Sequence, residues 1–91
     1  MKYQIQKTFT LLDMNEHIIE HNETKDPIIF DNFADVWGAV ANEAFKSFQE
    51  AQKIDQYAEM NGFSKHVLIK YNLEKPYKGK VEAKLEIKEV Q

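Results

Sequence analysis

The sequence predicts an α+β fold, in which an antiparallel sheet of four or five strands carries one long amphipathic helix packed across one face. Three observations support this prediction. Apolar residues recur every three or four positions through residues 31–61, which is the period of a helix. Apolar and polar residues alternate before and after that segment, which is the period of a strand. Turn-forming residues divide each flanking region, so the expected order is β-hairpin, long helix, β-hairpin.

The helix is expected to begin at Asp31 or Asn32, because either side chain can accept a free N–H of the first turn. Asn61 followed by Gly62 is the expected end, since glycine accepts the left-handed conformation of a helix C-cap. The apolar stripe weakens in its last turns, so a break near residues 53–56 is an alternative to a continuous helix. The stripe consists of Phe33, Val36, Trp37, Val40, Ala44, Phe45, Phe48 and Ala51.

The first hairpin is expected within residues 1–21. Residues 2–12 alternate and form a half-buried strand, whose apolar face is interrupted by Lys7. Turn chemistry follows at 13–16, and residues 17–21 are expected to return as a short strand. The apolar face of the first strand consists of Tyr3, Ile5, Phe9 and Leu11.

The remaining segments complete the expected sheet. Residues 22–26 are polar and are expected to form a loop, after which residues 28–30 form either a brief strand or an anchor in the core. Beyond the helix, residues 66–74 alternate as a strand and residues 75–79 carry the proline and glycine of a turn. Residues 80–90 alternate most regularly of all, with Val81, Ala83, Leu85 and Ile87 facing the core.

Composition bounds the class of protein. Residues 1–91 are expected to form one α+β domain without disulfides, because the chain has no cysteine. We expect a cytoplasmic location, since no leader-like segment or long apolar run occurs. All twelve basic residues are lysines and the net charge is −3, which makes nucleic acid an unfavourable partner. The lysine-only composition, with many asparagines and isoleucines, is typical of bacteria or phages with AT-rich genomes.

A metal site is not expected, although residues 17–21 match the H-x-x-E-H pattern of one class of zinc proteases. That chemistry needs both histidines on one face of a helix. Two adjacent isoleucines favour a strand here, which would separate His17 from His21 by roughly 13 Å at about 3.3 Å per residue. A solvated strand and turn is therefore the preferred interpretation, and no metal or cofactor is predicted.

Catalysis is not indicated by any local motif. The serines lie outside a G-x-S-x-G setting, the three glycines are too scattered to cradle a phosphate, and His66 is expected to face solvent at the start of a strand. An enzyme would require side chains that converge only in three dimensions, in a pocket between sheet and helix. This is kept as the third hypothesis.

Two surfaces, in addition to the free edges expected of the sheet, could bind a partner. Small residues lie on a flank of the predicted helix beside an aromatic one, which allows close approach by a partner protein, a second copy or the chain's own loop. The alternative is that Gly38 is a tolerated surface glycine. The second hairpin ends in the only basic spot, which could contact nucleic acid. We therefore expect a non-catalytic interaction or regulatory protein, acting on a partner or as a homodimer, with a nucleic-acid accessory role as the alternative. The flank comprises Ala34, Gly38, Ala41 and Phe45, and the basic tip comprises Lys75, Tyr77, Lys78 and Lys80.

Overall fold

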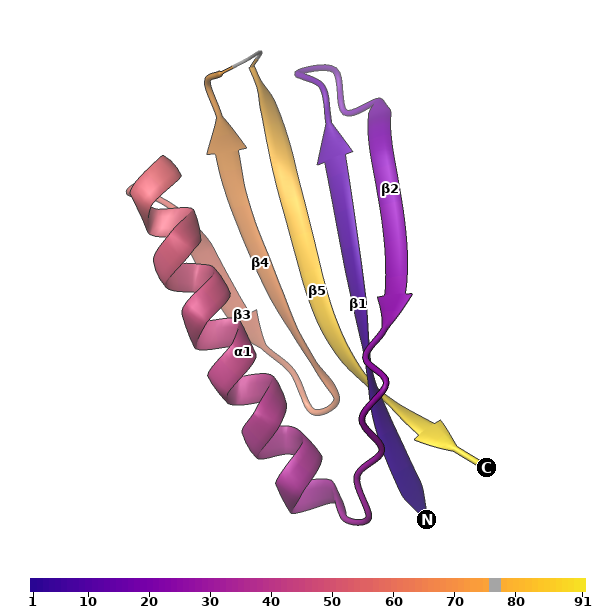
Figure 1. Cartoon of the computed structure of the whole chain (residues 1–91). Helices are drawn as coiled ribbons and strands as arrows, with labels where there is room; N and C mark the ends of the chain where they lie inside the picture. Colours follow the sequence, from indigo (N-terminus) through magenta and orange to yellow (C-terminus); the bar gives the residue numbers. More distant parts are fainter. Residues whose placement is uncertain (76–77) are drawn as a thin grey trace.

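The computed structural model describes residues 1–75 and 78–91, and in them the alternating segments form one antiparallel sheet (Figure 1). The predicted α+β class is confirmed, with five strands and one helix packed on them. The helix is 22 residues long. In chain order the elements are β1 (Lys2–Leu12), β2 (Ile18–Lys25), α1 (Phe33–Ile54), β3 (Glu59–Gly62), β4 (His66–Leu73) and β5 (Gly79–Val90).

The strands lie in the order β2-β1-β5-β4-β3, so the first and last strands of the chain are neighbours inside the sheet. β1 pairs with β5 along its whole length, from Lys2 opposite Val90 to Leu12 opposite Lys80. Because side chains alternate across a strand, Ile5 and its neighbour Ile87 share the face that carries the helix. The opposite face of the sheet is open and carries mostly polar side chains.

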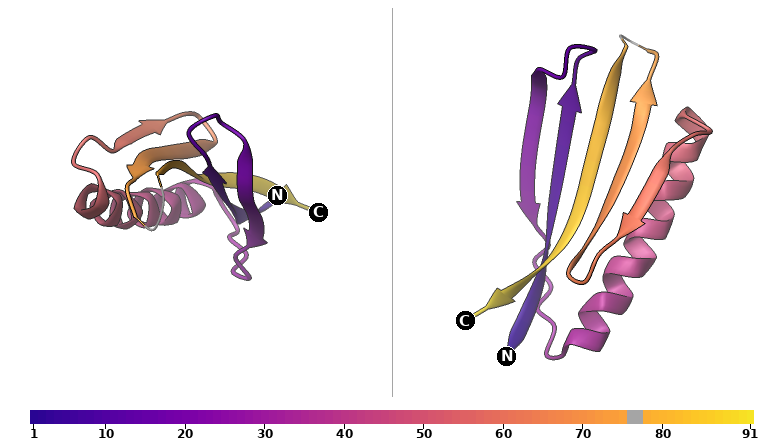
Figure 2. Two further views of the ribbon diagram at one scale, coloured as in Figure 1. Left: turned by 90° about the horizontal axis from the view of Figure 1, so that it is seen from above. Right: turned by 180° about the vertical axis from the view of Figure 1, so that it is seen from behind.

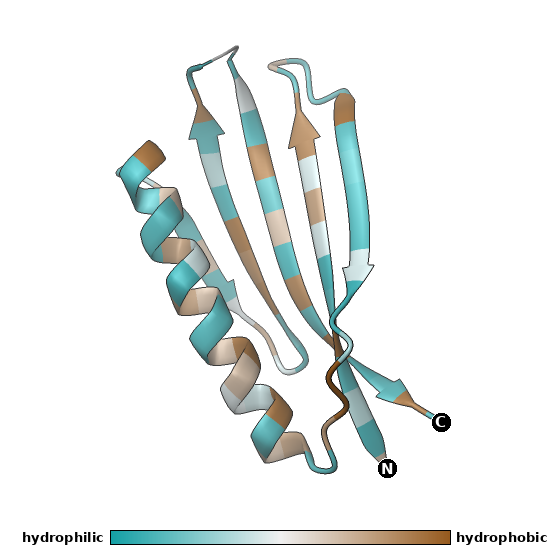
Figure 3. Cartoon of the chain, in the orientation of Figure 1, coloured by the Kyte–Doolittle hydropathy of each residue, from teal (hydrophilic) through white to brown (hydrophobic). Residues whose placement is uncertain are grey.

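The core lies between α1 and the central strands (Figure 2). α1 packs mainly over β4, with further contacts to β5 and β1, and it leaves all eight residues of β2 exposed. Hydropathy follows this layering, since brown and teal residues alternate along the central strands whereas β2 is largely hydrophilic (Figure 3). The buried cluster consists of Ile5, Val36, Val40, Ala44, Ala51, Val67, Ile69, Leu85 and Ile87.

Asn32 is the N-cap of α1, and its side-chain oxygen accepts the N–H of Asp35 at 2.8 Å. The predicted end at Gly62 is wrong, and the alternative of a break near residues 53–56 is confirmed, because the helix stops at Ile54 and Asp55 is already extended. The chain then turns and forms the short strand β3, which was not predicted. Phe45 also departs from the expected stripe, since it is 56% exposed and faces away from the core.

In the segment before the helix, one expectation is corrected and one of two alternatives is confirmed. β2 continues to Lys25, so most of the loop expected at residues 22–26 is strand. Residues 28–30 do not form a strand: Phe30 makes a single bridge to Tyr3, in which each backbone N–H donates to the other residue's carbonyl. Phe30 packs against the core as an anchor, while Ile28 and Ile29 remain exposed.

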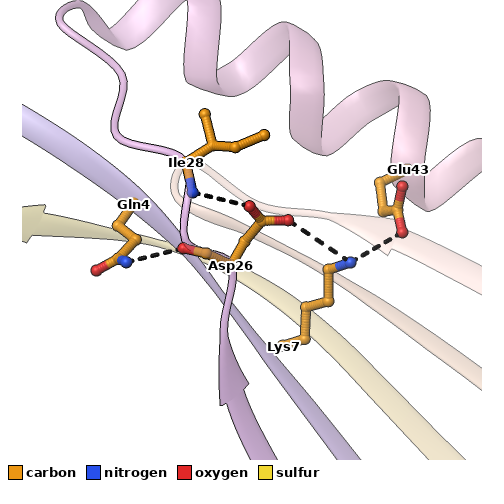
Figure 4. A network of polar contacts seen from close by, with 5 residues as sticks. All are labelled: Gln4, Lys7, Asp26, Ile28 and Glu43. Atoms are coloured by element: carbon orange, nitrogen blue, oxygen red, sulfur yellow. Dashed lines mark hydrogen bonds and ion pairs between the residues drawn. The ribbon is translucent and has the colours of Figure 1, made fainter.

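Lys7 interrupts the apolar face of β1, and its ammonium joins β1 to α1 and to the segment that follows β2 (Figure 4). Its ammonium donates to Glu43 of α1 at 3.0 Å and lies 4.0 Å from the carboxylate of Asp26. The backbone carbonyl of Asp26 accepts the side-chain amide of Gln4, and its carboxylate accepts the N–H of Ile28. This network fixes the segment that leaves β2 beside both the sheet and the helix.

Candidate functional site

The free edge of β2 is an open backbone surface of the fold. In the described ranges, β2 pairs with β1 and with no other strand, and all eight of its residues are exposed. An edge strand presents unpaired N–H and C=O groups, which can pair with another extended chain. The β2 edge, meaning the outward backbone groups of Ile18–Lys25, is therefore a candidate contact site.

The register of β1 and β2 decides which backbone groups point outward. The N–H of Asp26 donates to the carbonyl of Ile5 at 2.9 Å, just beyond the end of β2. Facing residues in an antiparallel pair alternate between hydrogen-bonded and non-hydrogen-bonded positions. Counting from Asp26, the backbone groups of Thr24, Asn22 and Glu20 point toward β1. The outward groups are consequently those of the intervening residues His21, Glu23 and Lys25.

Two protective features of edge strands are absent from the middle of β2. Residues 19–24 contain neither proline nor lysine, both of which discourage pairing at natural sheet edges. A β-bulge interrupts the pairing near Leu11 and Leu12, at the far end of the strand. The register is regular from Glu20 to Lys25, which leaves a straight stretch available for pairing.

The opposite edge of the sheet is better protected. β3 has only four residues, and short edge strands are one way to limit unwanted pairing. Beyond β3, the N–H of Asn72 in β4 donates to the carboxylate of Asp55 at 2.9 Å. Asp55 also accepts the N–H of Tyr57. These bonds from Asn72 and Tyr57 hold the pKa of Asp55 below its ordinary value.

The four residues of the helix flank are all exposed. A Cβ added at Gly38 would meet nothing within 4 Å, so no part of the chain described here approaches that glycine. Ala34 and Ala41 lie on the same side, with Phe45 beside them. The flank is thus available to a partner, and its role in binding remains a prediction.

The basic tip is only partly described, because Tyr77 lies outside the described residues. Lys75 and Lys78 are exposed. Lys80 is half-buried, and its ammonium lies 3.3 Å from the carboxylate of Glu16 on the neighbouring hairpin. That ion pair offsets one of the positive charges on which a phosphate contact would depend.

The H-x-x-E-H residues lie in a turn and a strand, as expected. His17 Nδ1 is 3.4 Å from the carboxylate of Asp13, whereas His21 lies in β2 with its ring nitrogens near Thr10 and Glu23. Over residues 1–75 and 78–91, no three histidine or acidic side chains cluster closely enough to hold a metal ion.

His66 lies at the start of β4 and stacks on Phe63, with ring centroids 4.4 Å apart. It faces Glu86 of β5. Burial alone would raise the pKa of Glu86, but a hydrogen bond from Lys88 and the charge of Lys84 outweigh burial and lower it. His66 and Glu86 therefore belong to a charged, partly solvated sheet surface.

A hollow beside α1 is the feature closest to the expected pocket between sheet and helix. Its lining includes apolar side chains of the sheet together with Lys7 of β1 and Glu43 and Ser47 of α1. Lys7 and Glu43 are paired with each other. Burial raises the pKa of Tyr71, which lines a separate hollow with Asp55 and Tyr57. Neither hollow contains a histidine.

The part of β2 that carries the free edge could not be identified from hydrophobic periodicity, because residues 20–25 contain no apolar side chain. One signal was available. The strand at residues 2–12 is much longer than the predicted return strand at 17–21, and paired strands of a hairpin tend to match in length. That mismatch favours extension of the second strand through the polar segment.

Comparison of the chain with protein-family models, with curated proteins and with solved structures finds no match. α1, the helix in the described part of the chain, lacks the length of apolar sequence needed to cross a membrane.

Proposed function

We propose that this chain is a non-catalytic, cytoplasmic interaction protein that acts by protein–protein contact. In this proposal, an extended segment of another polypeptide adds to the sheet at the β2 edge. Such strand addition gains affinity from main-chain hydrogen bonds and specificity from alternate side chains. The lysine-only composition supports a bacterial or phage origin.

One observation carries the proposal. β2 is a fully exposed edge strand with a regular register from Glu20 to Lys25, whereas the other edge is short and covered at Asn72 by Asp55. The backbone groups of His21, Glu23 and Lys25 therefore form a continuous row of donors and acceptors. A partner strand can occupy this row without displacing any described element.

Glu23→Pro tests the proposal, because proline lacks the outward N–H but leaves the hydrogen bonds of Asn22 and Thr24 to β1 in place. Glu23→Ala is the matched control, since it removes the same carboxylate and keeps the N–H. The two variants and the wild type are compared for partner retention by affinity capture, and for folding by circular dichroism.

A partner that binds the wild type and Glu23→Ala but not a folded Glu23→Pro supports the proposal. Hydrogen exchange gives a second readout, because the N–H of Glu23 should become protected when the partner binds. A partner that binds all three chains equally would place the contact elsewhere. A chain that binds neither another protein nor itself would overturn the proposal.

A further inference from the structure

We infer that the partner at the β2 edge is a second copy of this chain, paired antiparallel across a two-fold axis at Asn22. Two five-stranded sheets would then form one continuous sheet of ten strands. This inference rests on the proposed function, because it uses the same edge and names its occupant. It follows from the difference between the two edges and from the charges along β2.

The difference between the edges determines how such an assembly ends. A strand paired with its own copy about a two-fold axis uses the same surface on both chains, so each copy consumes its own β2 edge. The remaining edge of each sheet is the short β3, with Asp55 bound to the N–H of Asn72 beyond it. Assembly therefore closes at two chains and does not continue as a fibre.

The register is restricted by the outward backbone groups. The hydrogen-bonded pairs of the new ladder must use residues whose N–H and C=O groups point outward, as those of His21, Glu23 and Lys25 do. In the register about Asn22, Lys25 lies opposite Ile19, next to the β-bulge. With Asn22 on the axis, His21 of each copy faces Glu23 of the other. An imidazole N–H can donate to a carboxylate, so both pairs are favourable. Glu20 then faces Thr24, an uncharged residue.

The neighbouring registers are less favourable. With Glu23 on the axis, its carboxylate faces the same carboxylate of the second copy, and like charges placed directly opposite are destabilising. With Thr24 on the axis, Glu23 faces Lys25, but His21 faces Pro27, which has no N–H to donate. The ladder is consequently shorter in that register, and the register about Asn22 is preferred.

The free chain already presents these side chains. The side chains of His21 and Glu23 are 44% and 57% exposed. They lie 3.4 Å apart on the open face of β2, so exchanging one partner for the same group on a second copy requires only side-chain rotation. The dimer thus needs no change in the backbone of the sheet.

The absence of cysteine from the chain allows a direct test of the register. Asn22 would face itself at a non-hydrogen-bonded position, where Cα atoms are about 4.5 Å apart. That spacing suits a disulfide. Asn22→Cys should therefore form a covalent dimer under mild oxidation. Thr24→Cys is the matched control, because its Cα atoms would be roughly 13 Å apart at about 3.3 Å per residue.

The experiment combines non-reducing electrophoresis of both cysteine variants with light scattering of the cysteine-free wild type. We expect a wild-type dimer, efficient cross-linking of Asn22→Cys, and at least tenfold slower cross-linking of Thr24→Cys. Adding Glu23→Pro to Asn22→Cys should abolish the cross-link. Faster cross-linking at Thr24→Cys, or equal rates at both positions, would overturn the register.

The result also separates this inference from the proposed function. A monomeric wild type without cross-linking at Asn22→Cys would overturn the homodimer. If Glu23→Pro then still abolished binding of a different protein, the proposed function would stand with an unlike partner strand. If Glu23→Pro changed neither self-association nor any other binding, both proposals would fail together.

Discussion

The carboxylate of Asp55 accepts the backbone N–H of Asn72 at 2.9 Å, which ties the end of α1 to an edge of β4 that β3 does not reach. The same carboxylate accepts the N–H of Tyr57 and shapes the turn into β3. One side chain therefore ends the helix, directs the following strand and covers an exposed donor. The first prediction follows from its charge.

Stability should depend on pH through Asp55. Hydrogen bonds from Asn72 and Tyr57 lower its folded-state pKa below 3.8. A carboxyl whose pKa is lower in the folded chain than in the unfolded chain stabilises the fold at pH values above its unfolded-state pKa. This contribution is lost as the pH falls through its folded-state pKa. Asp55→Asn should therefore be less stable than wild type at neutral pH, and the difference should shrink below about pH 4. Urea unfolding across pH measures it, and a difference independent of pH would contradict the assignment.

Gly79→Ala should destabilise the fold. A Cβ at Gly79 of β5 would stand 2.5 Å from the backbone carbonyl oxygen of Leu12 in β1, so one of these two strands would have to shift. Overpacking of this kind costs about 1–3 kcal/mol. Gly62→Ala is the matched control, because its Cβ would meet nothing within 4 Å. Chemical denaturation should separate the two, and equal stabilities would argue against the close approach.

Gly38→Ala should stabilise the chain by about 0.5–1 kcal/mol, because alanine favours a helix interior and the added Cβ meets open space. Thermal unfolding measures this gain.

Gly38→Leu at the same site tests whether the helix flank is a contact surface. If the chain associates through the β2 edge, Gly38→Leu should leave its mass in solution unchanged. Loss of the dimer in a folded Gly38→Leu would instead place the contact on the flank.

Ile69→Ala should be among the most damaging single changes. Ile69 belongs to β4, lies in the core under α1 and is 1% exposed. Its truncation therefore leaves a cavity that costs about 2–5 kcal/mol. Ile29→Ala is the control, because Ile29 is 42% exposed before the helix, and the change should stay within about 0.5 kcal/mol. Urea unfolding of the two variants gives the comparison, and similar losses would contradict the assigned core.

Hydrophobic periodicity predicted the elements that bury a face. β1, β4, β5 and most of α1 follow from alternation or from helical spacing, because their apolar side chains meet in one core. Periodicity left two possible ends for α1, and the helix stops where the apolar stripe weakens, near residues 53–56. The spacing of Ile54 and Ala58 extends the helical pattern, yet the side chain of Asp55 binds the N–H of Tyr57 and so stabilises a turn.

Hydrophobic periodicity did not reveal the free edge of β2, for a different reason. One face of β2 belongs to the open side of the sheet, and its other face is not covered by α1. Both faces therefore carry polar residues, and Asn22 to Lys25 show no alternation. The small residues around Gly38 were visible in sequence, but only the three-dimensional structure shows that no described part of the chain packs on them.

Lys2 faces Val90, so the pairing that unites the sheet joins segments from opposite ends of the sequence. Each hairpin can close locally, but the two halves of the sheet meet only after a loop of almost the whole chain has closed. Closing such a loop costs entropy before its contacts form, and proteins with many non-local pairings fold slowly. On the ribosome, the edge of β1 that pairs with β5 therefore stays unpaired until β5 emerges. The chain is most exposed to misassembly during that interval.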